Sequence, residues 1–576
     1  MRVSKSPFFA NGDFLWIRSY NLPVSRIAAL RLSTLLLVFA LANPGHSQPA
    51  TAQPSAPDVA QYIAASWTTL TRNVLSCEAL VDPKIPPGRS VLYFPAEMPP
   101  DAHAKEVAEK CNVQVEPLPF KISSPAEVDV SKLKQHGLLY LPNPYVVPGG
   151  RFNEMYGWDS YFIVLGLLES GRKDLARGMV ENMFFELEHY GAVLNANRTY
   201  YLTRSQPPFL SSMIMAVCAA DPEHTCKNKQ WLQRAYAAAV KDHDNWLAPE
   251  HLAGSTGLSR YYDYGSGPVP EEANGNYEYY RETIKALLHR KDRLQYLEKA
   301  PTHNRDEFTL KPDFYEGDRA MRESGFDISF RFGPYGAETH HYAPVCLNSL
   351  LYRTEQDLGD LARQLGNKRA FGIWRVKAQL RWAAMDRYFW DGKQGLFFDY
   401  DFTKKKRSTY VFATTFYPLW AGLATKQEAA AVVRNLATFE KPGGIVMSTH
   451  ATGAQWDAPY GWAPIQLLAI EGLRRYGYND DANRLSKKWL CMIAENFQRE
   501  GTIREKYDVL TRSSDVHISA GYQANVIGFG WTNSVYLRLL HSLPDDQGSS
   551  TLKNVAPFCE WKHQDASANW DLRGAN

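Results

Sequence analysis

Apolar residues recur at helical spacing along most of the chain, and this periodicity limits the folds open to it more than any other feature. Steps of three and four residues place apolar side chains on one face of an α helix. Strand-like alternation is scarce. The sequence therefore predicts an all-α fold, with helical runs at Ala176, Met179, Val180, Met183 and Leu187; Leu358, Leu361 and Leu365; Ile465, Leu468 and Gly472; and Ala482, Leu485, Trp489 and Met492.

Glycines stand near the ends of these runs, at Gly171, Gly191, Gly366 and Gly477. Polar residues follow each one and restart the pattern, which is typical of short turns between antiparallel helices. A series of helical hairpins can close into a ring. The sequence has no repeat that demonstrates closure, so periodicity alone predicts mostly helical structure.

The overall composition is that of a globular protein with a neutral ligand. The 576 residues are 45% hydrophobic and 22% charged, enough to bury the core of one large domain or two. The formal net charge is only +3, and the longest basic run extends from Lys404 to Arg407. This low charge gives no case for nucleic acid and favours a neutral partner. We also expect a small-molecule substrate and a monomeric protein.

The N-terminal residues resemble an export signal. Arg26 and Arg31 precede the apolar run Leu32 to Ala42, which is too short to span a bilayer stably, and small residues follow it. This order predicts a signal peptide over residues 1–47, with either an extended n-region or a true start downstream of Met1. A Pro/Ala linker follows at 48–57. We expect a periplasmic or secreted protein without membrane attachment after signal removal.

Seven cysteines fit an exported protein with a disulfide or two. Proximity in sequence favours bridges between Cys77 and Cys111 and between Cys218 and Cys226. Free buried thiols are an equal alternative. No pair has metal-ligand spacing, and the odd count leaves one cysteine over.

Six segments between the helical runs mix aromatic residues with acids, arginines, amides and turn residues. Aromatic faces stack on the flat apolar faces of sugar rings, while Arg and carboxylate groups bind hydroxyls at the rim. One such segment could be a capped helix start, but six indicate a shared sugar-binding pocket. The segments span residues 148–162, 195–209, 322–332, 453–466, 504–509 and 528–533.

Two of these segments resemble the signatures of the trehalase family, glycoside hydrolase family 37. They are PGGRFNEMYGWDSYF at 148–162 and QWDAPYGWAP at 455–464, and NANRTYYLTRSQPP, ESGFD, EKYDV and GFGWTN match in the same order. The resemblance covers residues 58 to about 540. It implies an (α/α)6 toroid over 58–545, a tail of unknown role at 546–576, and inverting hydrolysis of α,α-trehalose to two glucoses without cofactor or metal.

The resemblance also implies the two carboxyls that such hydrolysis needs. An inverting glycosidase uses one protonated carboxyl as general acid and one carboxylate as general base, roughly 6.5–9.5 Å apart. Asp327 in ESGFD matches the acid, and its partly apolar neighbours should raise its pKa. Glu505 in REKYDV matches the base, and Arg504 or Lys506 would keep it ionised if either side chain points toward it.

Further positions match the sugar-binding residues of the family. Trp462 and Trp531 are expected in the pocket wall, although Trp462 could instead belong to the core. His340 and His341 are expected to cap or pack rather than catalyse. The predicted substrate-binding residues are Arg151, Trp158, Asp159, Asn195, Arg204, Ser205, Gln206, Glu271, Gly325, Trp456 and Asp457.

Two departures from the family pattern concern substrate binding and not the reaction type. Val269 stands before Pro270 and Glu271 where the family usually has Arg, which removes one expected cationic sugar contact. The stretch HISAGYQANVI at 517–527 replaces a glycine-rich lid that carries a glutamate. The alternatives are an inverting glucosidase acting on another α-glucoside and a sugar-binding relative with little turnover.

Overall fold

The computed structural model describes residues 58–82, 89–300, 308–544 and Cys559, all within one compact unit of the chain. The predicted signal peptide, the linker and the tail apart from Cys559 lie outside the described residues. Within the described ranges, no helix has both the length and the apolar character to cross a membrane.

Helices dominate the described residues, and each helical run predicted from the periodicity lies in one, apart from Leu365, which directly follows the end of α10. Gly171, Gly191, Gly366 and Gly477 follow helices with positive φ angles of 72°, 85°, 76° and 85°, which glycine adopts at little cost. The α helices are α1 Val59–Leu70, α2 Cys77–Leu80, α3 Ala102–Lys110, α4 Gly157–Glu169, α5 Lys173–Tyr190, α6 Leu210–Ala220, α7 Lys229–Asn245, α8 Glu278–Leu288, α9 Pro312–Glu323, α10 Val345–Gln364, α11 Lys368–Phe389, α12 Tyr417–Ala421, α13 Lys426–Arg434, α14 Leu436–Phe439, α15 Ala463–Arg475, α16 Asn479–Glu500 and α17 Gly530–His541.

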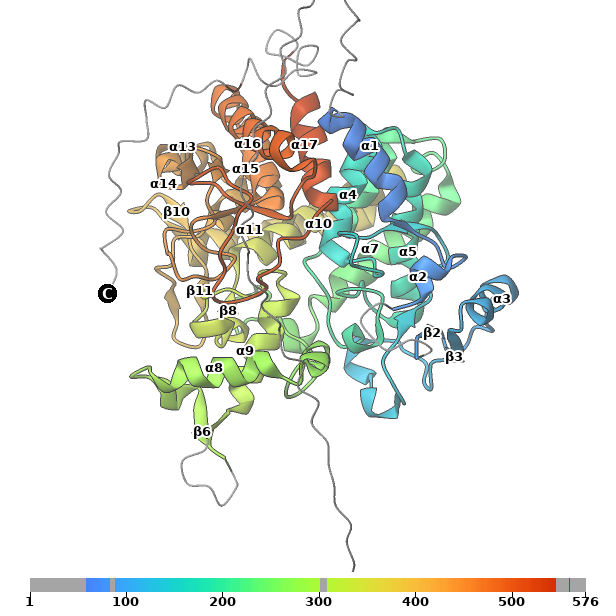
Figure 1. Cartoon of the computed structure of the whole chain (residues 1–576). Coiled ribbons are helices and arrows are strands. Elements are labelled where there is room, and N and C mark those ends of the chain that lie inside the picture. The colour runs from blue at the N-terminus through green and yellow to red at the C-terminus, as the bar shows by residue number, and fades with distance from the viewer. Residues whose placement is uncertain (1–57, 83–88, 301–307, 545–558, 560–576) are drawn as a thin grey trace, which may run out of the picture. The chain divides into compact units, whose positions relative to one another are not determined.

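Six helices contact one another in sequence order, and the last contacts the first. The order is α4, α6, α10, α12, α15 and α17, and Figure 1 shows α17, in red, beside α4, in teal. Other helices pack against them: α5 against α4 and α6, α7 against α6 and α10, α11 against α10, and α16 against α15 and α17. The core therefore includes contacts between the two ends of the helical series.

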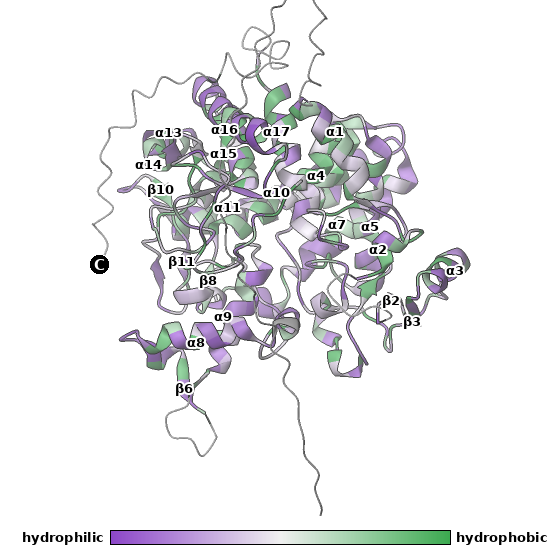
Figure 2. Ribbon diagram, in the orientation of Figure 1, coloured by the Kyte–Doolittle hydropathy of each residue, from purple (hydrophilic) through white to green (hydrophobic). Residues whose placement is uncertain are grey.

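Burial follows this arrangement. All of α4 from Gly157 to Leu167 is buried, whereas α3 buries only Ala104 and Ala108. Figure 2 shows the corresponding contrast between a largely hydrophobic α4 and a largely hydrophilic α3. Burying apolar surface stabilises the fold by roughly 25 cal/mol per Å², so the helices in mutual contact carry most of that contribution.

The predicted all-α fold holds in its coarser form: the described residues are mostly helical, with sixteen short strands among them. None is longer than four residues, and a strand this short shows too little alternation to be recognised in the sequence. β2, β3 and β4 form a parallel sheet in the order β3-β2-β4, with Leu92 opposite Leu138. The strands are β1 Thr71–Arg72, β2 Val91–Phe94, β3 Gln114–Pro117, β4 Leu138–Leu139, β5 Tyr145–Val146, β6 Leu297–Lys299, β7 Phe308–Leu310, β8 Tyr342–Ala343, β9 Trp390–Asp391, β10 Leu396–Phe397, β11 Tyr400–Asp401, β12 Lys406–Arg407, β13 Glu440–Lys441, β14 Gly444–Ile445, β15 Tyr460–Trp462 and β16 Lys506–Asp508.

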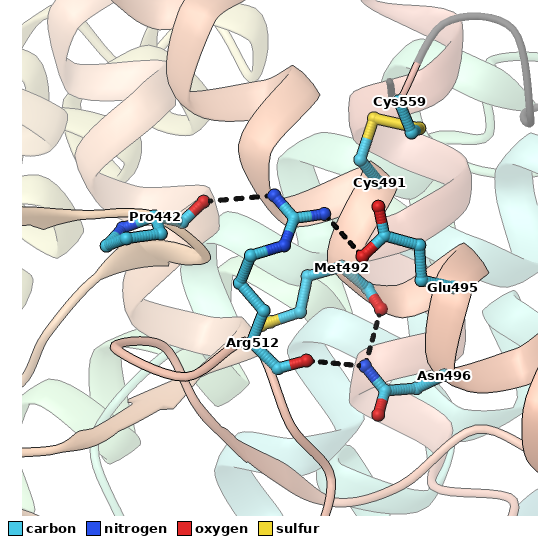
Figure 3. The surroundings of a disulfide bond; sticks show 7 residues. All are labelled: Pro442, Cys491, Met492, Glu495, Asn496, Arg512 and Cys559. Carbon is cyan, nitrogen blue, oxygen red and sulfur yellow. Dashed lines mark hydrogen bonds and ion pairs between the residues drawn. A yellow bond between two sulfur atoms is a disulfide. The ribbon is translucent and has the colours of Figure 1, made fainter. Parts of the chain in front are cut away.

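Three disulfides join the cysteines, and they include both bridges favoured by the sequence, Cys77–Cys111 and Cys218–Cys226. The third, Cys491–Cys559, joins α16 to the tail across 68 residues, a separation that proximity reasoning does not favour. Figure 3 shows this bridge near Glu495 of the same helix, which pairs with Arg512 at 2.6 Å. Cys346 is left over as a buried free thiol.

Candidate active site

A cavity of about 620 Å³ opens among the segments that precede α4 and α17 and follow α9. This volume is within the usual range for small-molecule sites. Loops supply most of its wall, as expected for binding residues held on a helical scaffold. Its lining consists of Pro148, Gly150, Arg151, Phe152, Tyr156, Trp158, Asp159, Asn195, Tyr200, Tyr201, Arg204, Gln206, Glu271, Glu272, Arg322, Gly325, Asp327, Gln455, Trp456, Trp462, Glu505, Tyr522, Phe529 and Trp531.

Four tryptophans form an aromatic cluster in this wall. The rings of Trp456 and Trp462 stack with centroids 4.0 Å apart and an interplanar angle of 11°. Trp158 lies 5.9 Å from Trp456 and 5.6 Å from Trp531. Such clusters combine large apolar faces with indole N–H donors. Trp462 is buried and also part of the lining, so it belongs to both the core and the pocket wall.

Asp327 lies in the loop that follows α9. Gly325, with a φ of 73°, precedes it, and a Cβ atom there would stand only 2.9 Å from the Trp158 indole. The backbone carbonyl of Asp327 accepts hydrogen bonds from Trp456 Nε1 (2.9 Å) and Gln455 Nε2. Burial raises the pKa of the Asp327 carboxyl, and the charge of Arg322 opposes that rise. The raised pKa agrees with the sequence prediction.

Glu505 directly precedes β16 and is held by a similar backbone contact. Its carbonyl accepts hydrogen bonds from Trp531 Nε1 at 3.2 Å and Thr532 Oγ1 at 3.3 Å. The buried Lys506 places Nζ 2.9 Å from Glu505 Oε2. Arg504 instead pairs with Glu500 at 2.8 Å. Of the two cations considered in the sequence, only Lys506 therefore contacts the carboxylate of Glu505.

Gln455 connects the two carboxyl-bearing segments. Its side-chain amide donates to the Asp327 carbonyl, and its oxygen accepts from Lys506 Nζ at 3.1 Å. The pairing of β15 with β16 sets Trp462 opposite Lys506 and keeps this contact in register. The loop that carries Asp327 and the segment that carries Glu505 are thus joined through one amide side chain.

Asp159 adds a third acid near the start of α4. Burial raises its pKa well above the ordinary range, and the charges of Glu505 and Asp327 raise it further. When several carboxyls lie close together in a buried site, ionising one raises the free energy of ionising the next. A raised pKa favours the protonated form of a carboxyl, and that form can donate a hydrogen bond.

Two arginines pair with acids from the 3-10 helix Pro270–Gly275. Arg204 pairs with Glu271, and Arg322 Nη2 lies 3.1 Å from Glu272 Oε1. Arg322 Nη1 also donates to the Tyr522 hydroxyl at 3.1 Å. These pairs hold planar guanidinium groups at the cavity wall, where their remaining donors suit vicinal hydroxyls.

Most of the predicted site residues line the cavity, but Ser205 and Asp457 do not. The Ser205 backbone N–H donates to Glu323 Oε1 at 3.1 Å, behind the wall. Asp457 is fully buried and accepts from Tyr410 (2.8 Å) and Ser448 (2.7 Å), so it holds the turn that carries Trp456. Predicted residues in the lining are Arg151, Trp158, Asp159, Asn195, Arg204, Gln206, Glu271, Gly325, Asp327, Trp456 and Glu505.

Val269 does not line the cavity. Its side chain is fully buried in a separate apolar cluster with Tyr280, Leu297 and Phe314, and its N–H donates to the Tyr280 hydroxyl at 3.0 Å. The valine therefore belongs to the core behind the cavity wall, and the loss of a cationic sugar contact at this position stays a prediction.

Several lining residues were not singled out from the sequence, and three of them bear polar groups that the site uses: Arg322, Gln455 and Tyr522. The first two lie inside quoted segments, so their position among the matched motifs was the available signal. Tyr522 lies in the stretch 517–527, which differs from the glycine-rich lid expected for the family. It supplies a hydroxyl where the expected lid has an acid. Motif comparison alone gave no reason to select it.

Comparison with known proteins gives the family. The family model described as Trehalase matches residues 82–544. The cytosolic neutral trehalase of Saccharomyces cerevisiae is 38% identical over 537 residues, covering 82% of this chain and 69% of that protein. The cytosolic neutral trehalase of Beauveria bassiana is 40% identical over 437 residues, covering 68% of this chain and 58% of that protein.

A solved structure agrees with these sequence relatives. The neutral trehalase of Saccharomyces cerevisiae superposes with a TM-score of 0.71 at 33% identity, covering 87% of this chain and 96% of the solved chain. The chain spans a little over half to about two thirds of the length of the curated fungal relatives it matches. On the family model, the sequence identities and the shared fold, the chain belongs to the trehalase family.

Proposed function

We propose that the chain hydrolyses α,α-trehalose to two glucoses with inversion, using Asp327 as general acid and Glu505 as general base. The observation that carries this proposal is that both carboxyls line one cavity, with a raised pKa for Asp327 and a lysine beside Glu505. Two acids in unlike surroundings are what inverting hydrolysis requires.

In this mechanism the protonated Asp327 donates its proton to the glycosidic oxygen as the bond from C1 to that oxygen breaks. A water molecule attacks C1 from the opposite face, and Glu505 takes the proton that the water loses. Trp158 and Trp456 offer faces for the sugar rings, and Arg204, Arg322 and protonated Asp159 offer donors for hydroxyls. The scaffold proposed for this site is an (α/α)6 toroid, supported by the closed series of contacts from α4 to α17.

Proton NMR of the first products tests the stereochemistry. Inversion releases one glucose as β and the other as α, so early spectra should contain both anomers in equal amounts. Spectra with α-glucose alone would contradict inversion. Kojibiose, nigerose and maltose, offered beside trehalose, test the substrate. Faster hydrolysis of one of these favours the alternative glucosidase, and binding of trehalose without any hydrolysis favours the sugar-binding alternative.

We also propose a periplasmic or secreted location. The signal-like N-terminus and three disulfides support it, because such bridges persist in oxidising compartments. The two fungal relatives above are named cytosolic, so the location proposed for this chain differs from theirs. Thiol titration of the denatured, unreduced protein should find one thiol per chain, Cys346. Seven titratable thiols in protein from its native host would contradict export. The monomeric state stays a prediction, which sedimentation can check.

A further inference from the structure

Outside the cavity lining, three potential metal ligands meet near the start of α9. Asp313 lies in the first turn of that helix, and His340 and His341 form the end of the 3-10 helix Thr339–His341. The two elements contact each other, and Figure 1 shows α9 near β8, the strand that begins directly after the histidines. The sequence alone does not reveal the group, because 27 residues separate Asp313 from His340.

The ligand atoms have the spacing of a coordination sphere. Asp313 Oδ1 lies 3.0 Å from His340 Nε2 and 3.5 Å from His341 Nε2. One potential ligand atom from each of the three residues lies within 4.8 Å of the other two. Four ligands at Zn²⁺ distances of about 2.0–2.1 Å in a tetrahedron stand about 3.4 Å apart. Small side-chain adjustments would therefore allow the three atoms to coordinate one ion.

The chemistry and exposure of the group also suit a metal. Two imidazoles and a carboxylate favour zinc-like transition ions over Mg²⁺ or Ca²⁺, which prefer all-oxygen sites. Asp313 is 56% exposed and His341 is 25% exposed, so an ion can enter from solvent. Glu316, whose Oε2 lies 3.9 Å from His340 Nε2, is placed to supply a fourth ligand.

We propose that Asp313, His340 and His341 bind a divalent transition-metal ion, Zn²⁺ in preference to Mg²⁺ or Ca²⁺, at a structural site separate from catalysis. The two elements that would share the ion flank the loop that carries Asp327. A bound ion would tie the start of α9 to the residues that follow this loop. Such a crosslink would add to the stability of the folded chain, because the ion binds the native arrangement and not the unfolded one.

Calorimetric titration of the untagged mature chain, stripped with a chelator and dialysed, tests the site with Zn²⁺ alone. The parent should bind one equivalent and melt at a higher temperature with zinc than without it. Asp313→Asn and His341→Asn should each weaken binding by more than about 10-fold, while their metal-free melting curves stay close to the parent curve. Co²⁺ should give the visible absorption of a four-coordinate site in the parent and lose it in both variants.

His224 provides a matched control, because it is an exposed histidine 2.8 Å from a carboxylate, that of Asp221, without a second histidine beside it. His224→Asn should keep the parent affinity. Absence of stoichiometric Zn²⁺ binding by the parent would overturn the proposal. Parent-like affinity in both Asp313→Asn and His341→Asn would overturn it as well, since the ion would then lie elsewhere.

Discussion

Asp327 and Glu505 line the same cavity and are anchored alike, yet their surroundings differ. A tryptophan indole donates to the backbone carbonyl of each residue, so the anchoring cannot explain two different roles. Among the described residues, Asp327 has no cation within ion-pair distance and its pKa is raised by burial, whereas Glu505 has Lys506 at 2.9 Å. Desolvation of Asp327 and the buried lysine beside Glu505 are thus what distinguish the proposed acid from the proposed base.

The strongest test of this comparison removes each carboxyl in turn. Asp327→Asn and Glu505→Gln should each lower kcat/KM for trehalose by roughly 100- to 10,000-fold, because each removes a positioned proton donor or acceptor. α-Glucosyl fluoride needs little help from an acid, so Asp327→Asn should harm its hydrolysis much less than Glu505→Gln does. Near-parent trehalose hydrolysis by either variant would contradict the assignment and direct attention to Asp159.

The pH profile of the parent should reflect the same division. Asp327 must be protonated to act, so activity is retained below its pKa and lost as pH rises through it. Because burial raises that pKa, the basic limb should lie above the ordinary range of an aspartate. Initial rates on trehalose across pH locate the limb, and the limb should be much weaker with α-glucosyl fluoride. A limb near the ordinary value would contradict the role of burial.

Much of the site was predictable from sequence, because motif order fixes which segments carry the polar and aromatic residues. The helices were predictable from periodicity where a long apolar face is buried, as in α5 and α16. What the sequence could not give were contacts between distant short elements: the sheet β3-β2-β4, the bridge from Cys491 to Cys559, and the direction in which Val269 and Arg504 point. Each depends on tertiary packing that local patterns do not encode.

Val269→Arg tests whether the apolar cluster around Val269 and Tyr280 contributes to the stability of the cavity wall near Asp327. Arginine would place an unpaired charge in the cluster around Tyr280, so the free energy of unfolding should fall by roughly 3–5 kcal/mol. Urea denaturation measures this loss, and Val269→Ile should cost less than about 1.5 kcal/mol. A stable Val269→Arg variant with a lower KM for trehalose would mean that the arginine reaches the ligand after all.

Lys506→Met tests the contribution of the lysine beside Glu505. Losing the charge-assisted hydrogen bond to Glu505 should lower kcat/KM by about 10- to 100-fold. Arg504→Met is the matched control: that arginine pairs with Glu500 instead, so its kcat/KM should stay close to the parent value. Equal losses in both variants would mean that general surface charge, and not the contact between Lys506 and Glu505, supports activity.

The smallest expected effect concerns Tyr522, in the stretch 517–527 that stands where the family has its lid. Its hydroxyl accepts a hydrogen bond from Arg322, at the end of the cavity that holds Asp327. Tyr522→Phe removes one hydroxyl and should raise KM for trehalose by about 2- to 10-fold with little change in kcat. If the lid contacts the leaving glucose, KM for α-glucosyl fluoride should not change, because that substrate lacks the second sugar. Tyr460→Phe is the control, since the Tyr460 hydroxyl binds the His517 carbonyl in the same lid but does not line the cavity. An equal rise in KM for Tyr460→Phe would mean that the mobility of the stretch 517–527 limits binding. The contact between the Tyr522 hydroxyl and Arg322 would then make no specific contribution to trehalose binding.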